Sequence, residues 1–154
     1  MNQTTSQDID TVIRHASARG AAIVGLGSIA VIHLLDSIGK FHETPYMFWM
    51  YVALMLGSLA TAGALLLHRS RLAFAAAGGL AASALIGYIL SRTTGLPNAT
   101  GDIGNWTEPL GLASMMVEGT VIAVSAIGWR LSGQANTALA TDRDRETRRL
   151  GLAA

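Results

Sequence analysis

Four long stretches of the chain are apolar and almost free of charged residues. They run from Gly20 to Gly39, from Tyr46 to Leu67, from Leu72 to Leu90 and from Leu110 to Trp129. Each is close to the roughly 20 apolar residues that a helix needs to cross a bilayer. None shows the alternation of a membrane β-barrel, and an open sheet edge would leave backbone groups unpaired in lipid. The pattern predicts an all-α integral membrane protein, a four-helix bundle.

The connections between these stretches differ in length. Lys40 to Pro45 and His68 to Arg71 are short turns, whereas Ser91 to Pro109 is long and rich in Gly, Asn, Thr and Pro. A connection of this length is large enough to have a shape of its own.

Positive side chains near the spans predict the orientation, because Lys and Arg are retained on the cytoplasmic side. One side of the hairpin topology carries most of them: Arg14, Arg19, Arg69, Arg71 and Arg130, with Arg143, Arg145, Arg148 and Arg149 in the tail. Only Lys40 and Arg92 lie on the other side. We therefore expect a multi-pass protein of the cell membrane with both termini cytoplasmic.

The predicted organisation has three parts. Residues 1–19 form a cytoplasmic leader, residues 20–130 the transmembrane bundle and residues 131–154 a charged cytoplasmic tail. Apolar residues recur at helical spacing in the leader, which suggests a short helix in the headgroup region. The tail alternates in charge sign, which is typical of a solvated helix or a frayed end.

Composition narrows the classes of function. The 154 residues are 51% hydrophobic and 14% charged, with 11 Lys and Arg against 10 Asp and Glu, and there is no cysteine. This excludes a disordered chain, a disulfide scaffold and cysteine chemistry. The formal charge of +1 offers no basic field for nucleic acid. The expected partners are the lipid bilayer and, through small residues on the helix faces, a homo-oligomer or a larger membrane complex.

Ionisable residues inside the spans carry the candidate chemistry, because each costs about 2.5–3.5 kcal/mol at the bilayer centre. His33 and Asp36 share one face of the first span, since they are three residues apart. Glu118 lies near the middle of the fourth span, on a predicted stripe with Met115, Gly111 and Glu108. We expect these groups to converge in the outer half of the bundle.

Imidazole and carboxylate groups together suit a divalent transition metal, and bundles build such sites from several helices. The candidate ligands are His33, Asp36, His42, Glu43 and Glu118, with Arg92 and Glu108 as a gate or salt bridge over the opening. The sequence has no Glu-x-x-His pair and no His-x-x-x-His pair. Three other interpretations stay open: a purely structural polar pair, a proton or ion path, and a quinone or haem contact.

The two acidic residues before the second and fourth spans also have a local explanation. In Glu43-Thr44-Pro45 the threonine is a predicted N-cap and the proline the first helical residue, and Glu108-Pro109 repeats the pattern. Carboxylates near a helix N-terminus are favoured by the helix dipole. Asp36 and Glu118 have no such explanation.

The segment Ser91-Arg92-Thr93-Thr94-Gly95-Leu96-Pro97, followed by Asp102 and by Glu118 in the next span, resembles a group of small four-span bacterial membrane proteins. In that group a Ser-Arg-Thr-x-Gly-Leu-Pro segment follows the third span. A His in the first span and a His or Glu near the second often accompany it, which here would be His33, His42 and Glu43. The resemblance implies the topology and no particular chemistry.

Two classes of function follow. The first is a small binding or transport protein whose polar cluster holds a metal ion or a proton, sealed from lipid but open to the long loop. The second is a non-catalytic subunit or assembly factor of a larger complex, with an exposed small-residue face and Arg92 paired with a single carboxylate. An enzyme ranks third, because a catalytic set would be expected to show more than one histidine within the membrane and this sequence shows only His33 there.

Overall fold

The computed structural model describes residues 3–68 and 71–151, and the side chains of residues 9–68, 71–133, 146–148 and 151. These residues form five helices: α1 (Gln3–Asp36), α2 (Lys40–Glu43), α3 (Pro45–Leu67), α4 (Arg71–Thr93) and α5 (Pro109–Gly151). The described residues contain no strand beyond one isolated bridge in the loop after α4. Four of the helices are long and apolar enough to cross a membrane, which confirms the predicted four-span, all-α architecture.

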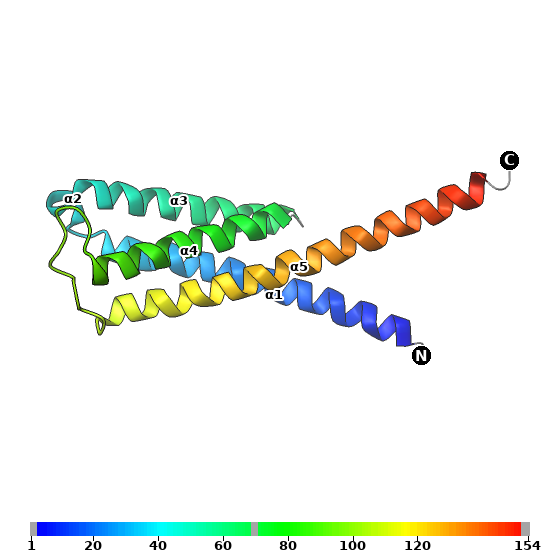
Figure 1. Ribbon diagram of the computed structural model, residues 1–154, viewed down its shortest axis with the longest axis horizontal. Coiled ribbons are helices and arrows are strands. Elements are labelled where there is room, and N and C mark those ends of the chain that lie inside the picture. Colours follow the sequence, from blue (N-terminus) through cyan, green and yellow to red (C-terminus); the bar gives the residue numbers. More distant parts are fainter. Residues whose placement is uncertain (1–2, 69–70, 152–154) are drawn as a thin grey trace.

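The four long helices lie side by side and both ends of the chain lie at the same end of the bundle (Figure 1). Helix α5 packs against α4 and α1, and α1 packs against α3, whereas α3 and α4 contact each other less. At one end of the bundle lie α2 and the loop 94–108, which we call the loop end. At the other end α1 and α5 extend beyond the α3–α4 hairpin, and we call this the terminal end.

The first span is longer than the hydrophobic pattern indicated. Its apolar segment covers Ile9–Asp36, so the expected leader is part of the same continuous helix. The helix ends at Asp36 rather than Gly39, where the backbone has turned to a φ of 90°. Likewise α5 continues into the expected tail as one helix that ends at Gly151. Residues 152–154 and Arg69 lie outside the described part.

Pro45 and Pro109 are the first residues of α3 and α5, as predicted. The capping interaction at Thr44 was predicted wrongly. Thr44 occupies the N-cap position of α3 but makes no side-chain cap hydrogen bond, and its buried hydroxyl has no hydrogen-bond partner.

Small residues set the distance between the helices. At Gly128 of α5 an added Cβ would lie 2.2 Å from the ring of Phe74 in α4. At Gly25 of α1 it would lie 2.3 Å from Val121 of α5. Because only hydrogen occupies these positions, the large side chains pack directly on the neighbouring backbone. Phe74 and Val121 consequently belong to the buried core.

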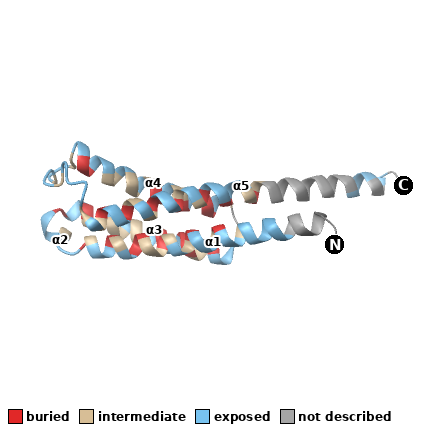
Figure 2. Ribbon diagram, turned by 90° about the horizontal axis from the view of Figure 1, so that it is seen from below, coloured by how far each residue is buried: buried red, intermediate tan, exposed pale blue. Residues whose placement is uncertain are grey.

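Buried residues face inward and exposed residues outward (Figure 2), and many of the exposed residues are large and apolar. Among the most exposed side chains are Leu67, Leu72 and Met116, which are 79%, 80% and 76% exposed. A helical bundle that presents such residues outward is suited to contact with lipid.

Charged residues divide between the two ends as predicted. Arg71 at the terminal end stacks on the ring of Trp129 at 4.1 Å, and Arg14, Arg19 and Arg130 lie toward the same end. Lys40 and Arg92 lie at the loop end. The assignment of these ends to the two sides of the membrane stays a prediction.

Candidate functional site

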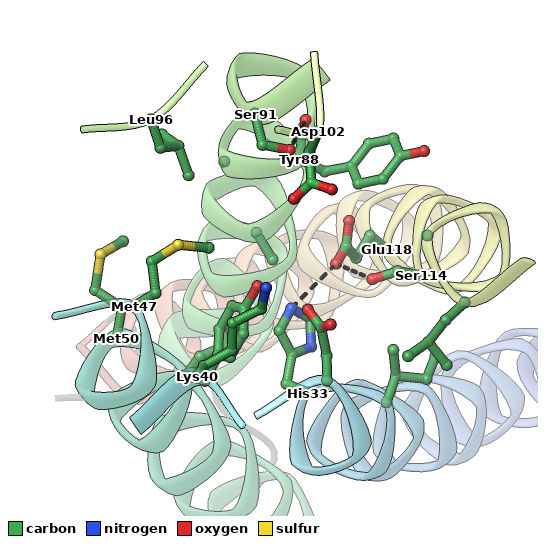
Figure 3. A pocket seen from close by; sticks show the side chains of 18 of the residues that line it. His33, Lys40, Met47, Met50, Tyr88, Ser91, Leu96, Asp102, Ser114 and Glu118 are labelled. Carbon is green, nitrogen blue, oxygen red and sulfur yellow. Dashed lines mark hydrogen bonds and ion pairs between the residues drawn. The ribbon is translucent and has the colours of Figure 1, made fainter. Parts of the chain in front are cut away.

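A cavity of about 230 Å³ lies between the four long helices at the loop end. One wall is apolar and is formed mainly by α3, through Met47, Met50 and Leu54. Figure 3 shows the two methionines on one side of this space, with His33 and Glu118 on the other. The remaining polar lining comes from all five helices and the loop: Asp36, Lys40, Tyr51, Ser83, Tyr88, Ser91, Arg92, Asp102, Glu108 and Ser114.

His33 of α1 and Glu118 of α5 meet on the floor of this cavity. Nε2 of His33 lies 3.9 Å from Oε1 of Glu118. Nδ1 of His33 donates to the carbonyl oxygen of Ile29, one turn earlier, and this hydrogen bond of 2.9 Å aims Nε2 across the bundle. Both side chains are buried. The expected convergence of these two groups is therefore present.

Glu118 is held in place by its own helix. The hydroxyl of Ser114 donates to Oε1 of Glu118 at 2.7 Å. Oε2 is buried and accepts no hydrogen bond. Glu118 is 0% exposed, and a buried carboxylate oxygen without a donor is costly in an apolar surrounding. This atom has unused capacity to interact with a positively charged group.

Asp36 and Tyr51 continue the polar surface toward the loop end. Asp36 lies one turn after His33 on α1 and lines the cavity. The ring of Tyr51 packs edge-on against His33 with centroids 5.2 Å apart, and its hydroxyl lies close to the Asp36 carboxylate. The imidazole is therefore fixed by contacts from both sides of the α1–α3 interface.

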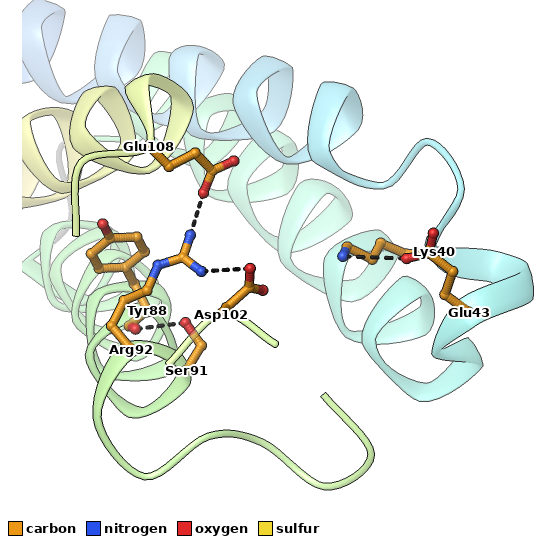
Figure 4. Close-up of polar contacts among 7 residues, drawn as sticks. All are labelled: Lys40, Glu43, Tyr88, Ser91, Arg92, Asp102 and Glu108. Carbon is orange, nitrogen blue, oxygen red and sulfur yellow. Dashed lines mark hydrogen bonds and ion pairs between the residues drawn. The ribbon is translucent and has the colours of Figure 1, made fainter. Parts of the chain in front are cut away.

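Arg92 lies at the mouth of the cavity, where it contacts residues of the loop, including the one that precedes α5. Its guanidinium forms ion pairs with Oδ1 of Asp102, at 3.0 Å, and with Oε2 of Glu108 (Figure 4). It also stacks on the ring of Tyr88 at 4.9 Å. The Arg92 side chain is only 6% exposed, whereas its carboxylate partners are 41% and 36% exposed. Arg92 thus joins α4 to the loop and to the start of α5.

The loop over this mouth has a defined shape, as its length predicted. The amide of Gly104 donates to the carbonyl of Arg92 at 2.9 Å, and the hydroxyl of Tyr46 donates to the carbonyl of Pro97 at 2.7 Å. Gly95 has a φ of 76°, a left-handed conformation that favours glycine. The loop is consequently tied to both α3 and α4.

Two of the expected ligands lie outside the cavity. His42 is exposed and packs edge-on against Phe41, and the side chain of Glu43 is 69% exposed and pairs with Lys40 at 3.6 Å (Figure 4). Glu43 does not reach the cavity, because it belongs to α2 and the helical register of α3 begins only at Pro45.

The residues present do not form a metal site. In the described ranges, no three His, Asp or Glu side chains are grouped so that they could hold a metal ion. His33 and Glu118 approach each other, but the rim carboxylates Asp102 and Glu108 are engaged by Arg92. A transition-metal site needs three or more ligands at bonding distance.

The charge of the cavity lining is predominantly negative. In the described structure it contains the carboxylates of Asp36, Asp102, Glu108 and Glu118 and the cationic side chains of Lys40 and Arg92. Both cations are engaged in ion pairs. No described Lys or Arg nitrogen lies within ion-pair distance of Asp36 or Glu118. The cavity is therefore suited to a positively charged occupant.

Sequence reasoning missed part of this site. Ser114 precedes Glu118 by one helical turn, a spacing that signals a side-chain pair, whereas the predicted stripe placed Met115 beside Glu118. Met115 does not line the cavity, but Gly111 and Glu108 of that stripe do. Tyr51 and Tyr88 were also missed, because an aromatic residue near a span end has the same pattern as a membrane-interface residue.

Comparison with known proteins adds no relative from which a function could be transferred, so the assignment rests on the geometry above. No family model, no curated protein and no solved structure matches this chain.

Proposed function

We propose that this small multi-pass membrane protein binds a monovalent cation in the cavity at the loop end, as a protein of the binding or transport class. The observation that carries the proposal is the carboxylate of Glu118, which is fully buried and leaves Oε2 without a donor. The cavity lies between the helices, is lined in part by loop residues and reaches the loop end.

The energetics favour a cation at this position. An ionised carboxylate deep in the span has no lysine or arginine partner here and only the imidazole of His33 at 3.9 Å, and a charge that is not fully compensated is costly in that environment. A proton on Glu118 offsets the cost when the cavity holds no ligand. A bound cation offsets it by direct attraction, so the two compete for the same carboxylate.

A monovalent cation fits these residues better than a divalent metal. Asp36 and Glu118 supply the charge, and the ring of Tyr51 contributes a further attractive surface for a cation. The donor set lacks the three convergent ligands that a divalent transition metal needs.

The test is the binding of methylammonium chloride to the purified protein, measured by isothermal titration calorimetry. Glu118→Gln keeps the size of the side chain and an acceptor for Ser114, and we expect it to weaken binding at least 10-fold. Glu146→Gln is the matched control, because Glu146 is exposed on α5 far from the cavity. Equal affinities in the two variants, or no binding to the parent protein, would overturn the proposal.

Asp36→Asn provides the second arm of the experiment. We expect a smaller loss than for Glu118→Gln, because Asp36 is partly exposed whereas Glu118 is fully buried. A circular dichroism melt of each variant separates lost binding from lost folding.

The subunit alternative is supported by one of its two expected features. Helix α4 exposes small residues, and nothing lies within 4 Å of a Cβ built at Gly79. Arg92, however, pairs with two carboxylates rather than one. The binding proposal accounts for the buried Glu118, and the subunit alternative does not.

A further inference from the structure

We infer that the cation is the amine head group of a single-chain amphiphile, which enters the cavity from the lipid between α3 and α4. The inference rests on the proposed function and adds the class of ligand and its route. It is carried by an opening in the side of the bundle and by the distribution of charge around it.

The opening lies where α3 and α4 face each other. Met50 of α3 and Ser83 of α4 line the cavity, and both are also exposed, Met50 at 59%. Residues that line a cavity and the outer surface together mark a place where the cavity reaches that surface, so the polar cluster is not sealed from lipid, contrary to the expectation. Nearer the terminal end the gap closes, since a Cβ at Gly57 of α3 would lie 3.2 Å from Leu80 of α4.

Gly87 leaves free space in the α4 side of this opening. It lines the cavity, and nothing lies within 4 Å of a Cβ built on it. The other glycine that lines the cavity behaves differently: at Gly111 the Cβ would lie 2.5 Å from the ring of Tyr88. Close helix packing therefore does not explain the absence of a side chain at Gly87.

The position of the opening along the helices points to lipid rather than water. Ser83 precedes the end of α4 at Thr93 by ten residues, or about 15 Å at the rise of an α-helix. Half of a hydrocarbon core is about 15 Å. The opening therefore reaches to the depth of acyl chains, and a small hydrated ion would gain nothing from it.

One side of the cavity is apolar and the other is acidic, as the binding of a cationic amphiphile requires. The α3 side carries Met47, Met50 and Leu54, and thioether side chains adapt to apolar ligands of varied shape. Glu118 lies on the opposite side (Figure 3), and Asp36 also lines the cavity. A ligand that fits has its ammonium group at the carboxylates and its chain along the methionines, leaving through the gap.

The test compares methylammonium with n-octylammonium on the purified protein in one detergent. The chain of octylammonium gains contact with the α3 side, so we expect it to bind at least 10-fold more tightly than methylammonium. Gly87→Leu and Ser83→Leu fill the opening and are expected to weaken octylammonium binding at least 10-fold. Methylammonium binding to the same two variants serves as the reference, and we expect the loss of octylammonium affinity to exceed any loss of methylammonium affinity at least 3-fold, because the small ion enters from the loop end.

Gly79→Leu is the matched control. It adds the same side chain to α4 two turns from Gly87, at a residue that also has nothing within 4 Å of its Cβ and does not line the cavity. Partitioning of octylammonium into micelles is common to all variants, so ratios between variants are unaffected by it.

The outcomes separate the two proposals. If methylammonium binds and octylammonium binds no more tightly, the amphiphile inference is overturned and the proposed function stands. The same conclusion follows if neither Gly87→Leu nor Ser83→Leu lowers the affinity for octylammonium. If neither amine binds the parent protein, the proposed function fails.

Discussion

His33 and Glu118 face each other across the α1–α5 interface, with Nε2 of the imidazole 3.9 Å from Oε1 of the carboxylate. This distance is that of an ion pair when the imidazole is protonated and too long for a hydrogen bond. The hydroxyl of Ser114, by contrast, lies within hydrogen-bond distance of the same oxygen. The pair is therefore held in place by its neighbours, Ile29 and Ser114, and is open to a third group.

The His33–Glu118 relationship predicts energetic coupling. We expect His33→Ala and Glu118→Gln to be non-additive in the free energy of unfolding, with an interaction energy of about 0.5–3 kcal/mol, as for other side chains in contact. The measurement is a double-mutant cycle by denaturant titration in detergent. His68→Ala replaces His33→Ala in the control cycle, because His68 is exposed at the terminal end. Additivity in both cycles would show that the imidazole and the carboxylate do not interact.

A disulfide is expected to form between α1 and α5 when Gly25 and Val121 are both replaced by cysteine. A Cβ built at Gly25 lies 3.7 Å from Cβ of Val121, within the range of natural disulfides. The native chain contains no cysteine, so every cross-link comes from the engineered pair. Gel mobility under mild oxidation is the measurement. Gly27→Cys with Val121→Cys is the control and should stay uncross-linked, since nothing lies within 4 Å of a Cβ at Gly27; equal yields would argue against this helix register.

Replacement of Gly128 by alanine is expected to destabilise the bundle by about 1–3 kcal/mol, the usual cost of overpacking a core. The added methyl would lie 2.2 Å from the ring of Phe74, and both residues are buried. Thermal unfolding of the detergent-solubilised protein measures the loss. The double variant Gly128→Ala with Phe74→Leu should recover part of it. Gly119→Ala is the control, because that position has free space and should leave the melting temperature nearly unchanged.

Loss of the Arg92 guanidinium is expected to loosen the loop over the cavity. In Arg92→Gln, the carboxylates of Asp102 and Glu108 lose their common partner and repel each other. The amide of Gly104, which donates to the Arg92 carbonyl, should then exchange with solvent deuterium at least 10-fold faster. Lys40→Gln is the control, because its partner Glu43 is largely exposed and such pairs contribute little. An unchanged rate at Gly104 would show that backbone contacts alone hold the loop.

The spans and two of the helix starts could be predicted from the sequence. In lipid, a segment must satisfy the hydrogen bonds of its backbone within itself, whatever its neighbours are. A long run of apolar residues therefore predicts a helix before any packing is known. Pro45 and Pro109 mark helix starts because a proline lacks the backbone donor that the first helical turn leaves unused.

The first span shows where this reasoning was limited. Charged and polar residues before Gly20 suggested a separate leader, yet α1 is one helix from Gln3. A helix continues through polar residues as long as its backbone hydrogen bonds continue. The change from apolar to polar residues therefore indicates where a helix leaves the lipid, and not where the helix ends. The error at Glu43 has a different cause, since the non-helical backbone at Thr44 separates α2 from α3 and breaks the helical register between Glu43 and the second span.

The sequence by itself determined that this chain has four apolar helices and which ionisable residues lie within them, because both follow from the cost of placing polar groups in hydrocarbon. Tertiary structure decided which helix faces meet. Close approach at glycines such as Gly25 brought His33 to Glu118, and the looser α3–α4 contact left a cavity beside them. These outcomes depend on side-chain shapes of residues distant in the chain, so no local pattern contains them.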